Sequence, residues 1–303
     1  MQPFFSIVVV CLNPGEKLKS TLQSIQRQTF KDYEVVIKDG GSEDGSLAAV
    51  EEIFPAQIQK CGQGQKAADN ESMQFPKVRL YREKDSGIYD AMNQAAERAE
   101  GRYVYYLNCG DLFSKEDVLL RMADFIRESA SYKEQLPGIY YGNIWERLTG
   151  QEVASNPQID AFGCYRNVPC HQACFYSREL LLEHPFDTKY KVRADYEQFL
   201  WSFFAAEHKK VTFAYINMRI ADYEGGGFSE TAKNRKRSLQ EHKEITGKYM
   251  SRSQLITYKT ILLLTLAPLR TALSKNEKTA GIYNQVKNGI YRNSHRRSSQ
   301  KEK

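Results

Sequence analysis

Four aspartates of this chain, Asp39, Asp85, Asp111 and Asp195, stand where a carboxylate could bind a ligand or move a proton. Asp39 directly follows a strand-like segment, residues 33–38, and opens an Asp-Gly-Gly turn. Its carboxylate could accept a hydrogen bond from the base or the ribose of a bound nucleotide. Alternatively it caps its own loop, because this is a common turn sequence. The residue alone leaves both roles open.

A second acidic segment, residues 83–93, places Asp85 in a loop, then Gly87, then the start of a helix. The unpaired amide groups at a helix N-terminus favour anions, so a phosphorylated ligand suits this position. Asp85 and Asp90 could instead be N-terminal caps that offset the helix dipole. Both roles can hold together.

A third acidic position ends the turn Asn108-Cys109-Gly110-Asp111, which follows another strand-like segment. A hard divalent cation here would take oxygen ligands from Asp111, a bound diphosphate and water. A structural turn that binds no metal would also explain this sequence pattern. Asp111 is the metal ligand that we predict from the sequence.

His171 lies among cysteines, with Cys164, Cys170 and Cys174 nearby. The histidine could contact a diphosphate or an acceptor, or it could be a core residue that makes one hydrogen bond. The cluster could ligate zinc, but it has no Cys-x-x-Cys pair and no matching second half. We therefore expect buried free thiols.

The elements that must position these residues alternate between strand and helix. Strand-like apolar runs cover residues 4–10, 33–38, 78–81 and 102–107, and helical patterns follow near Leu18, over 47–54 and over 88–100. This rhythm predicts a doubly wound, mostly parallel sheet. Ligands of such sheets bind beyond the carboxyl ends of the strands, so the loops at Cys11, Asp39 and Asn108 should meet at one site.

The rest of the chain is less regular. Residues 55–77 have little apolar periodicity and are expected to form a long, mobile surface insertion. Segments 138–145 and 173–176 are typical of strands, and 193–204 is typical of a helix. From about residue 230 the chain becomes helical and basic. We therefore predict a catalytic domain over 1–230 and a helical extension over 231–303.

Composition narrows the classes of protein. With 41% hydrophobic and 26% charged residues, the chain is typical of a folded globular protein. Its net charge of +6 suits an anionic partner. The positive charge is concentrated after Lys233 without interleaved aromatic residues, so we predict no nucleic-acid partner. The N-terminal residues lack a secretory signal, which predicts a cytoplasmic protein.

Taken together, residues 4–230 resemble the family 2 glycosyltransferases, which share the GT-A fold, a Rossmann-like sheet with flanking helices. The matching segments are 28–30, 39–46, 85–93 and 107–111, in that order. His171-Gln172, residues 194–197 and residues 226–229 are similar to the subgroup found in bacterial surface-polysaccharide synthesis.

The resemblance implies an inverting transfer of a sugar from a nucleotide-diphosphate sugar to an acceptor hydroxyl. Asp39 and Asp85 would hold the nucleoside, Asp111 would help to bind Mn²⁺ or Mg²⁺, and Asp195 would be the catalytic base. Further predicted donor-site residues are Leu12 and Asn13 in the first loop, and Gly41, Gly87, Asn93, Asn108 and His171 in the matched segments. As acceptor, the resemblance implies a glycan or a polyprenyl-diphosphate-linked sugar.

Two departures from the family pattern affect the donor site. The metal motif of the family usually reads Asp-x-Asp, whereas Asn108 and Gly110 leave Asp111 as the only carboxylate of this turn. Leu12 stands where many relatives have an aromatic residue that stacks on the base. Its apolar face can still cover a pyrimidine, which favours uridine, with guanosine and deoxythymidine as the alternatives. A nucleotidyltransferase acting on a sugar phosphate is the alternative activity.

The apolar residues of the C-terminal part form a stretch, 255–269, that is too short to span a bilayer. Basic residues flank it, so it could lie in the interface of an anionic membrane, on the inner face of the cell membrane. Alternatively, this helix packs on the catalytic domain.

Overall fold

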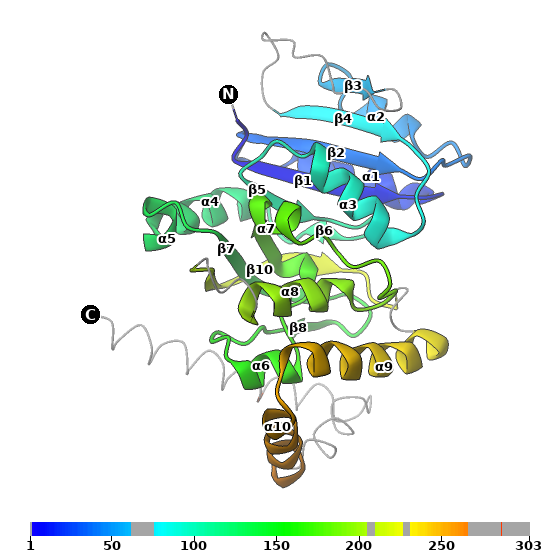
Figure 1. The fold of residues 1–303 in the computed structure, drawn as a ribbon. Coiled ribbons are helices and arrows are strands. Elements are labelled where there is room, and N and C mark those ends of the chain that lie inside the picture. The colour runs from blue at the N-terminus through cyan, green and yellow to red at the C-terminus, as the bar shows by residue number, and fades with distance from the viewer. Residues whose placement is uncertain (1, 62–75, 205–209, 227–230, 266–285, 287–303) are drawn as a thin grey trace.

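The computed structural model describes residues 2–61, 76–204, 210–226, 231–265 and 286. Within this part of the chain, ten strands form one sheet, and helices cover both of its faces (Figure 1). The strand order is β3-β4-β2-β1-β5-β9-β7-β10-β6, with β8 paired to β7. This confirms the predicted α/β class with a central sheet.

The first half of the sheet is parallel. It consists of β1 (Phe5–Cys11), β2 (Tyr33–Asp39), β3 (Ile58–Cys61), β4 (Lys77–Arg82) and β5 (Tyr103–Tyr106). The inner strands are runs of β-branched and aromatic residues that are buried on both faces, as parallel strands require. Cys11 pairs with Asp39, and Asp39 with Arg82. The register therefore brings the strand ends to one edge.

Helices cover this half of the sheet on two faces. They are α1 (Glu16–Gln26), α2 (Ala48–Ile53), α3 (Ile88–Arg98) and α4 (Val118–Glu128). One core contains the apolar residues of α1, α2 and α4, and the other contains those of α3. The first core includes Ile7 and Val9, whereas Val8 belongs to the second. Alternate side chains of β1 thus fill opposite cores.

The second half of the sheet is mixed. It contains β6 (Leu112–Phe113), β7 (Gly138–Glu146), β8 (Gln151–Val153), β9 (Cys174–Ser177) and β10 (Thr212–Tyr223). Strand β9 runs antiparallel to both β5 and β7, and β10 runs parallel to β7. Short helical segments connect these strands: α5 (Ala130–Lys133), α6 (Ala161–Arg166), the 3₁₀ turn η1 (His171–Ala173), α7 (Arg178–Glu183) and α8 (Ala194–Phe204).

One expectation from the sequence is wrong in part. Residues 55–77 are not an unstructured insertion throughout, because Ile58–Cys61 forms the edge strand β3, parallel to β4. An edge strand is paired on one side only and tolerates a short, polar sequence, so its periodicity was too weak to detect. Residues 62–75 lie outside the described part of the chain.

The C-terminal part continues with α9 (Ala232–Tyr249) and α10 (Arg252–Leu264). Helix α9 packs on α8, and its Ile245 is fully buried in the second core. Helix α10 buries none of its residues and touches α6 through Tyr258, whose ring lies 5.4 Å from that of Phe162. In the described residues, no helix is both long and apolar enough to cross a membrane.

Candidate active site

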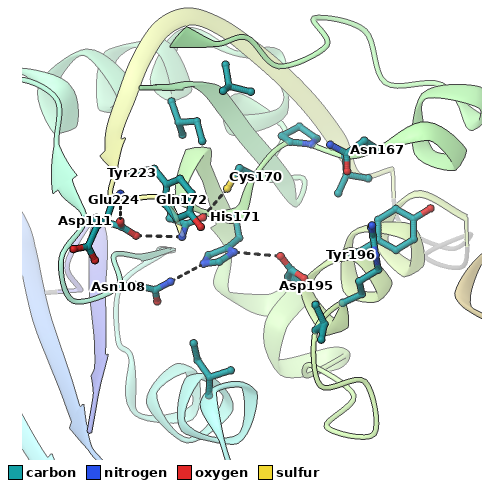
Figure 2. Close-up of a pocket in the computed structure, with 18 of the residues that line it drawn as sticks. Asn108, Asp111, Asn167, Cys170, His171, Gln172, Asp195, Tyr196, Tyr223 and Glu224 are labelled. Carbon is teal, nitrogen blue, oxygen red and sulfur yellow. Dashed lines mark hydrogen bonds and ion pairs between the residues drawn. The ribbon is translucent and has the colours of Figure 1, made fainter. Parts of the chain in front are cut away.

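A cavity of about 720 Å³ lies between the end of β5, η1 and the start of α8 (Figure 2). Four of the predicted site residues line it, namely Asn108, Asp111, His171 and Asp195. They come from the loop after β5, from η1 and from the first turn of α8, which are far apart in the sequence. The volume is that of a small-molecule site.

The carboxylate of Asp195 is the centre of a hydrogen-bond chain. Its Oδ2 lies 3.2 Å from Nδ1 of His171, and the Nε2 of that ring lies 3.2 Å from Nδ2 of Asn108. An amide nitrogen can only donate, so this contact requires Nε2 to accept and places the imidazole proton on Nδ1, toward Asp195. Asn108 therefore fixes the tautomer in which His171 supports the carboxylate.

Tyr89, on α3, completes the surroundings of Asp195. Its hydroxyl lies 2.9 Å from Oδ1 of Asp195 and 2.9 Å from the backbone oxygen of Val192. Burial acts to raise the pKa of Asp195, but the hydrogen bonds from His171 and Tyr89 outweigh it, so the pKa of that carboxyl lies below its ordinary value. Asp195 is therefore ionised at neutral pH and partly exposed to the cavity.

Asp111 is almost fully buried beside the same cavity. Its Oδ1 accepts a hydrogen bond from the backbone N–H of Glu224 at 2.9 Å, and its Oδ2 accepts one from the amide of Gln172 at 3.2 Å. Burial raises the pKa of Asp111, and these hydrogen bonds offset the shift only in part. The carboxylate is thus held in place but protonates more readily than an ordinary aspartate.

The residues around Asp111 fit a divalent cation that is shared with a substrate. In the described residues, no group of three or more His, Cys, Asp or Glu side chains is placed to hold a metal by itself. The carboxylate of Glu224 lies nearby, because a Cβ on Gly110 would be 2.7 Å from its Oε2, and this oxygen also pairs with Nζ of Lys17 at 2.7 Å. Mg²⁺ and similar ions are commonly held by one or two carboxylates with substrate phosphates and water. This donor set meets that pattern.

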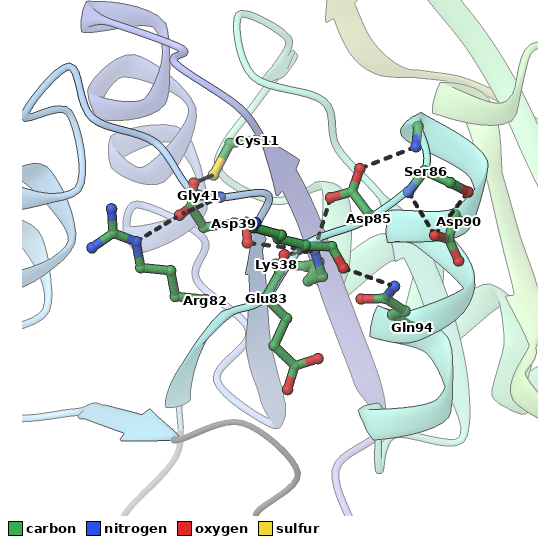
Figure 3. A network of polar contacts seen from close by, with 12 residues as sticks. Cys11, Lys38, Asp39, Gly41, Arg82, Glu83, Asp85, Ser86, Asp90 and Gln94 are labelled. Carbon is green, nitrogen blue, oxygen red and sulfur yellow. Dashed lines mark hydrogen bonds and ion pairs between the residues drawn. The ribbon is translucent and has the colours of Figure 1, made fainter.

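Asp39 lies outside this cavity, at the end of β2, and its carboxylate is bound by its own loop (Figure 3). It accepts hydrogen bonds from the backbone of Gly41 at 3.0 Å and from the hydroxyl of Ser42 at 2.5 Å, and it is fully buried. The exposed Arg82 approaches it at 3.5 Å. The turn-capping role is therefore present in the structure.

Asp85 is held by a lysine that the sequence did not single out. The fully buried Lys38 places its Nζ 2.9 Å from Oδ2 of Asp85 and 2.6 Å from the backbone oxygen of Glu83 (Figure 3). The other oxygen of Asp85 accepts a hydrogen bond from the N–H of Gly87 at 3.1 Å. The sequence could have indicated this pair, because Lys38 stands in a central buried strand and a lysine is rarely buried without a partner.

Leu12 and Asp85 face each other across Gly40. A Cβ on Gly40 would be 2.9 Å from Oδ2 of Asp85 and 3.4 Å from a methyl group of Leu12, so only glycine leaves this approach open. Leu12 is 62% exposed, which leaves an apolar surface available to a flat ring. Asn13 lies beside it and accepts a hydrogen bond from the N–H of Glu43.

Asn93 has a clear structural contact. Its side-chain amide donates to the backbone oxygen of Phe186 and accepts from the N–H of the same residue, both at 2.9 Å. These bonds connect α3 to the segment before α8, away from the cavity.

Two glycines of the predicted donor site, Gly41 (φ 107°) and Gly87 (φ 134°), have backbone angles that favour glycine.

The cysteines near His171 are free thiols. Cys164 and Cys174 are buried, Cys170 is partly buried, and burial raises the pKa of the Cys170 thiol to about 12. These thiols are therefore protonated and unreactive at neutral pH. Figure 2 shows Cys170 directed toward Gln172.

The fold is that of an α/β protein with a pocket at the end of β5, and comparison with known sequences identifies the family. The model of glycosyl transferase family 2 matches residues 6–182. The chain belongs to this family and is a glycosyltransferase. It is similar to the PGL/p-HBAD biosynthesis glycosyltransferase of Mycobacterium tuberculosis, at 31% identity over 231 residues, which is 76% of this chain and 80% of the relative.

Solved structures share the fold. Residues 1–349 of S. aureus TarS in complex with UDP superimpose with a TM-score of 0.53 at 18% identity, over 74% of this chain and 61% of that one. The mannosyltransferase PcManGT of Pyrobaculum calidifontis, in complex with GDP-Man and Mn²⁺, gives 0.55 at 15% identity, over 97% and 83%. The present chain spans less than two thirds of the TarS chain. These neighbours confirm the GT-A fold.

Proposed function

We propose that this glycosyltransferase inverts the configuration at the transferred sugar and that Asp195 is its catalytic base. The observation that carries this proposal is the carboxylate of Asp195, which faces the cavity, is ionised, and is oriented by His171 and Tyr89. An inverting reaction needs one carboxylate that removes the acceptor proton while the acceptor oxygen attacks from the face opposite the leaving group.

The chemistry follows from how charge develops. As the bond between the sugar carbon and the diphosphate oxygen breaks, the sugar becomes cation-like and the diphosphate gains negative charge. Asp195 takes the hydroxyl proton of the acceptor as the new carbon–oxygen bond forms. The hydrogen bond from His171 keeps the carboxylate turned toward the acceptor.

The donor is a nucleotide-diphosphate sugar, with UDP favoured. Leu12 and Asn13 would cover the base, and Asp39, Gly41, Asp85 and Gly87 would surround the nucleoside, with Asn93 stabilising α3 behind them. The exposed apolar face of Leu12 beside Gly40 supports this assignment. TarS is in complex with UDP and PcManGT with GDP-Man, so binding of both nucleotides has to be compared.

A divalent cation, Mn²⁺ or Mg²⁺, would be held by Asp111 together with diphosphate oxygens and water. When bound, it would stabilise the negative charge on the leaving diphosphate. Asn108 and His171 line the cavity in contact with each other and would close the diphosphate region. PcManGT in complex with GDP-Man and Mn²⁺ is a neighbour with the same fold.

The acceptor would be a glycan or a polyprenyl-diphosphate-linked sugar in the synthesis of a bacterial cell-surface polysaccharide or glycolipid. This role agrees with a cytoplasmic enzyme that binds the inner face of the cell membrane peripherally. The exposed apolar residues of α10 support it, since Ile256, Leu263 and Leu264 are 67%, 59% and 77% exposed.

The substitution Asp195→Asn tests the proposal. The amide has nearly the same size but cannot accept the proton, so we expect turnover to fall by on the order of a hundredfold or more while donor affinity is kept. Donor binding is measured by calorimetry with UDP and with GDP, and turnover by release of the nucleoside diphosphate. Release of pyrophosphate from a nucleoside triphosphate would instead indicate a nucleotidyltransferase.

Asp187→Asn is the matched control, because Asp187 precedes the same helix and does not line the cavity. Its turnover should stay near that of the wild type. Wild-type turnover in Asp195→Asn would rule out the assignment of the base.

A further inference from the structure

The part of the cavity lining that comes from α6 and from the segment before α8 forms a cationic wall. Lys191 and Arg193, from the segment before α8, line it together with Arg166 at the end of α6. We propose that this wall is the acceptor subsite for a phosphate group, so that the acceptor is a phosphate or diphosphate ester. The inference rests on the proposed function, since it assumes that the acceptor enters on this side of Asp195.

The distribution of charge along the cavity supports this division. The acidic residues that line it are Asp111, Glu224 and Asp195. The first two lie together at the Gly110 turn, where Lys17, which also lines the cavity, pairs with Glu224 at 2.7 Å. The lining residues contributed by α6, by residues 167–169 and by the segment before α8 are basic, polar or apolar. A metal with a donor diphosphate suits the acidic end, and an anion suits the basic end.

The backbone of residues 191–193 is held in place by α9. The carboxylate of Glu241, on α9, accepts hydrogen bonds from three consecutive backbone N–H groups, those of Lys191, Val192 and Arg193, at 2.9, 3.0 and 2.9 Å. Glu241 is only 7% exposed, so its carboxylate binds these backbone groups and not solvent. The segment is thus fixed before any ligand arrives, which reduces the entropy lost on binding.

The side chains of this segment remain available to a ligand. The Nε of Arg193 donates to the hydroxyl of Ser238 at 2.7 Å, and its guanidinium lies 5.3 Å from the centre of the Tyr196 ring. In the described part of the chain, no carboxylate forms an ion pair with Lys191 or Arg193. An oriented guanidinium, with a lysine two positions away that lines the same cavity, is well matched to phosphate oxygens.

A phosphate ester could reach this wall as a soluble sugar phosphate or as a lipid-linked one. Two probes separate these sources: glucose 1-phosphate, and decyl phosphate below its micelle concentration. Binding is measured by calorimetry on the full chain saturated with UDP and magnesium, so that the donor side is occupied. We expect at least one probe to bind, and the tighter one identifies the source. Neutral glucose should bind more weakly than its phosphate.

The double variant Lys191→Ala/Arg193→Ala should weaken phosphate binding at least tenfold and keep the affinity for UDP. Its fold should persist, because Glu241 binds the backbone of this segment rather than these side chains. Lys189→Ala is the control, since Lys189 is exposed, pairs with Glu244 and does not line the cavity.

Unchanged phosphate affinity in the double variant would overturn the inference, as would binding of neither probe or displacement of UDP by the probe. These outcomes are distinct from failure of the proposed function, which would appear as absent UDP binding by the wild type or full turnover in Asp195→Asn.

Discussion

At the scale of single residues, the ionisation of two aspartates is set in opposite directions by their neighbours. Asp195 accepts hydrogen bonds from His171 and Tyr89, which outweigh its burial and lower its pKa. For Asp111 burial dominates and the pKa is raised. We therefore expect Asp195 to be ionised across the neutral range, as a base must be. We also expect the affinity of Asp111 for a metal to fall as the pH is lowered.

Tyr89→Phe tests the first consequence. Without the phenol hydrogen bond the pKa of Asp195 should rise, so the acidic limb of the pH profile of kcat/KM should move to higher pH, with turnover at neutral pH reduced about tenfold or less. Tyr196→Phe is the control, because this phenol also lines the cavity but donates to the backbone oxygen of Cys164. An acidic limb at the same pH in Tyr89→Phe and wild type would contradict this role.

Asp111→Asn tests the second. UDP should bind the wild type more tightly with Mn²⁺ than with a chelator, and this gain should shrink as the pH is lowered, because the raised pKa leaves Asp111 protonated at higher pH than an ordinary aspartate. The variant should lose the gain at every pH. Calorimetry measures both affinities. Asp90→Asn is the control, because the pKa of the Asp90 carboxyl is lowered, in contrast to that of Asp111. Equal affinity with metal and chelator in wild type and variant would refute the metal assignment.

At the scale of elements, contacts with α9 fix the position of α8. Glu241 binds the backbone just before α8, and Glu197, inside α8, is fully buried between the partners His184, Lys248 and Tyr249. Burial acts to raise the pKa of Glu197, and these partners outweigh it and lower the pKa to about 2. The carboxylate thus joins the two helices and is not exposed to the cavity.

Glu197→Gln should therefore reduce stability more than turnover. The pKa of Glu197 falls from 4.5 unfolded to about 2 folded, so ionised Glu197 stabilises the protein at neutral pH by on the order of 3 kcal/mol. This contribution is complete above pH 4.5 and is lost as the pH falls toward 2. Urea denaturation at neutral and acidic pH should show a difference between wild type and variant that narrows with acidification.

Glu244→Gln is the control on the same helix, because Glu244 is exposed and its pairing with Lys189 contributes little. A variant Glu197→Gln with wild-type stability at neutral pH would contradict the bridging role. A large loss of turnover in a folded Glu197→Gln preparation would contradict the assignment of the base to Asp195.

At the scale of the whole molecule, the C-terminal helices have different relations to the sheet. Helix α9 contributes to the second core and positions α8, whereas α10 extends away from the sheet and contacts α6 (Figure 1). The boundary near residue 230 stays a prediction. The apolar side chains of α10 are exposed next to the element that carries Arg166, so a membrane bound by α10 would lie near the proposed acceptor subsite.

We expect the intact chain to float with anionic liposomes and this binding to weaken as salt is raised. Deletion from about Ser251 should abolish it. The triple variant Ile256→Ser/Leu263→Ser/Leu264→Ser should weaken it without unfolding, because these residues are exposed. Leu239→Ser, an exposed leucine on α9, is the matched control. Equal flotation of the intact and truncated chains would disprove membrane association through this region.

The sequence by itself determined the sheet and the order of the site segments. Apolar runs such as β1 and β2 are typical of buried strands, and the ends of parallel strands lie at one edge, which predicted that the loops at Cys11, Asp39 and Asn108 meet there. These are local properties, because periodicity and turn chemistry depend on neighbours in the chain. In the structure Asn108 lines the cavity, whereas Asp39 lies outside it.

Only the tertiary structure decided which partners each carboxylate has. The contact of Tyr89 with Asp195 joins residues 106 positions apart, and that of Lys38 with Asp85 joins residues 47 apart. Such pairs depend on how helices pack on the sheet, as do the edge strand β3 and the support of α8 by Glu241. Whether a carboxylate is exposed or buried, and hence where its pKa lies, follows from that packing and leaves no pattern in the sequence.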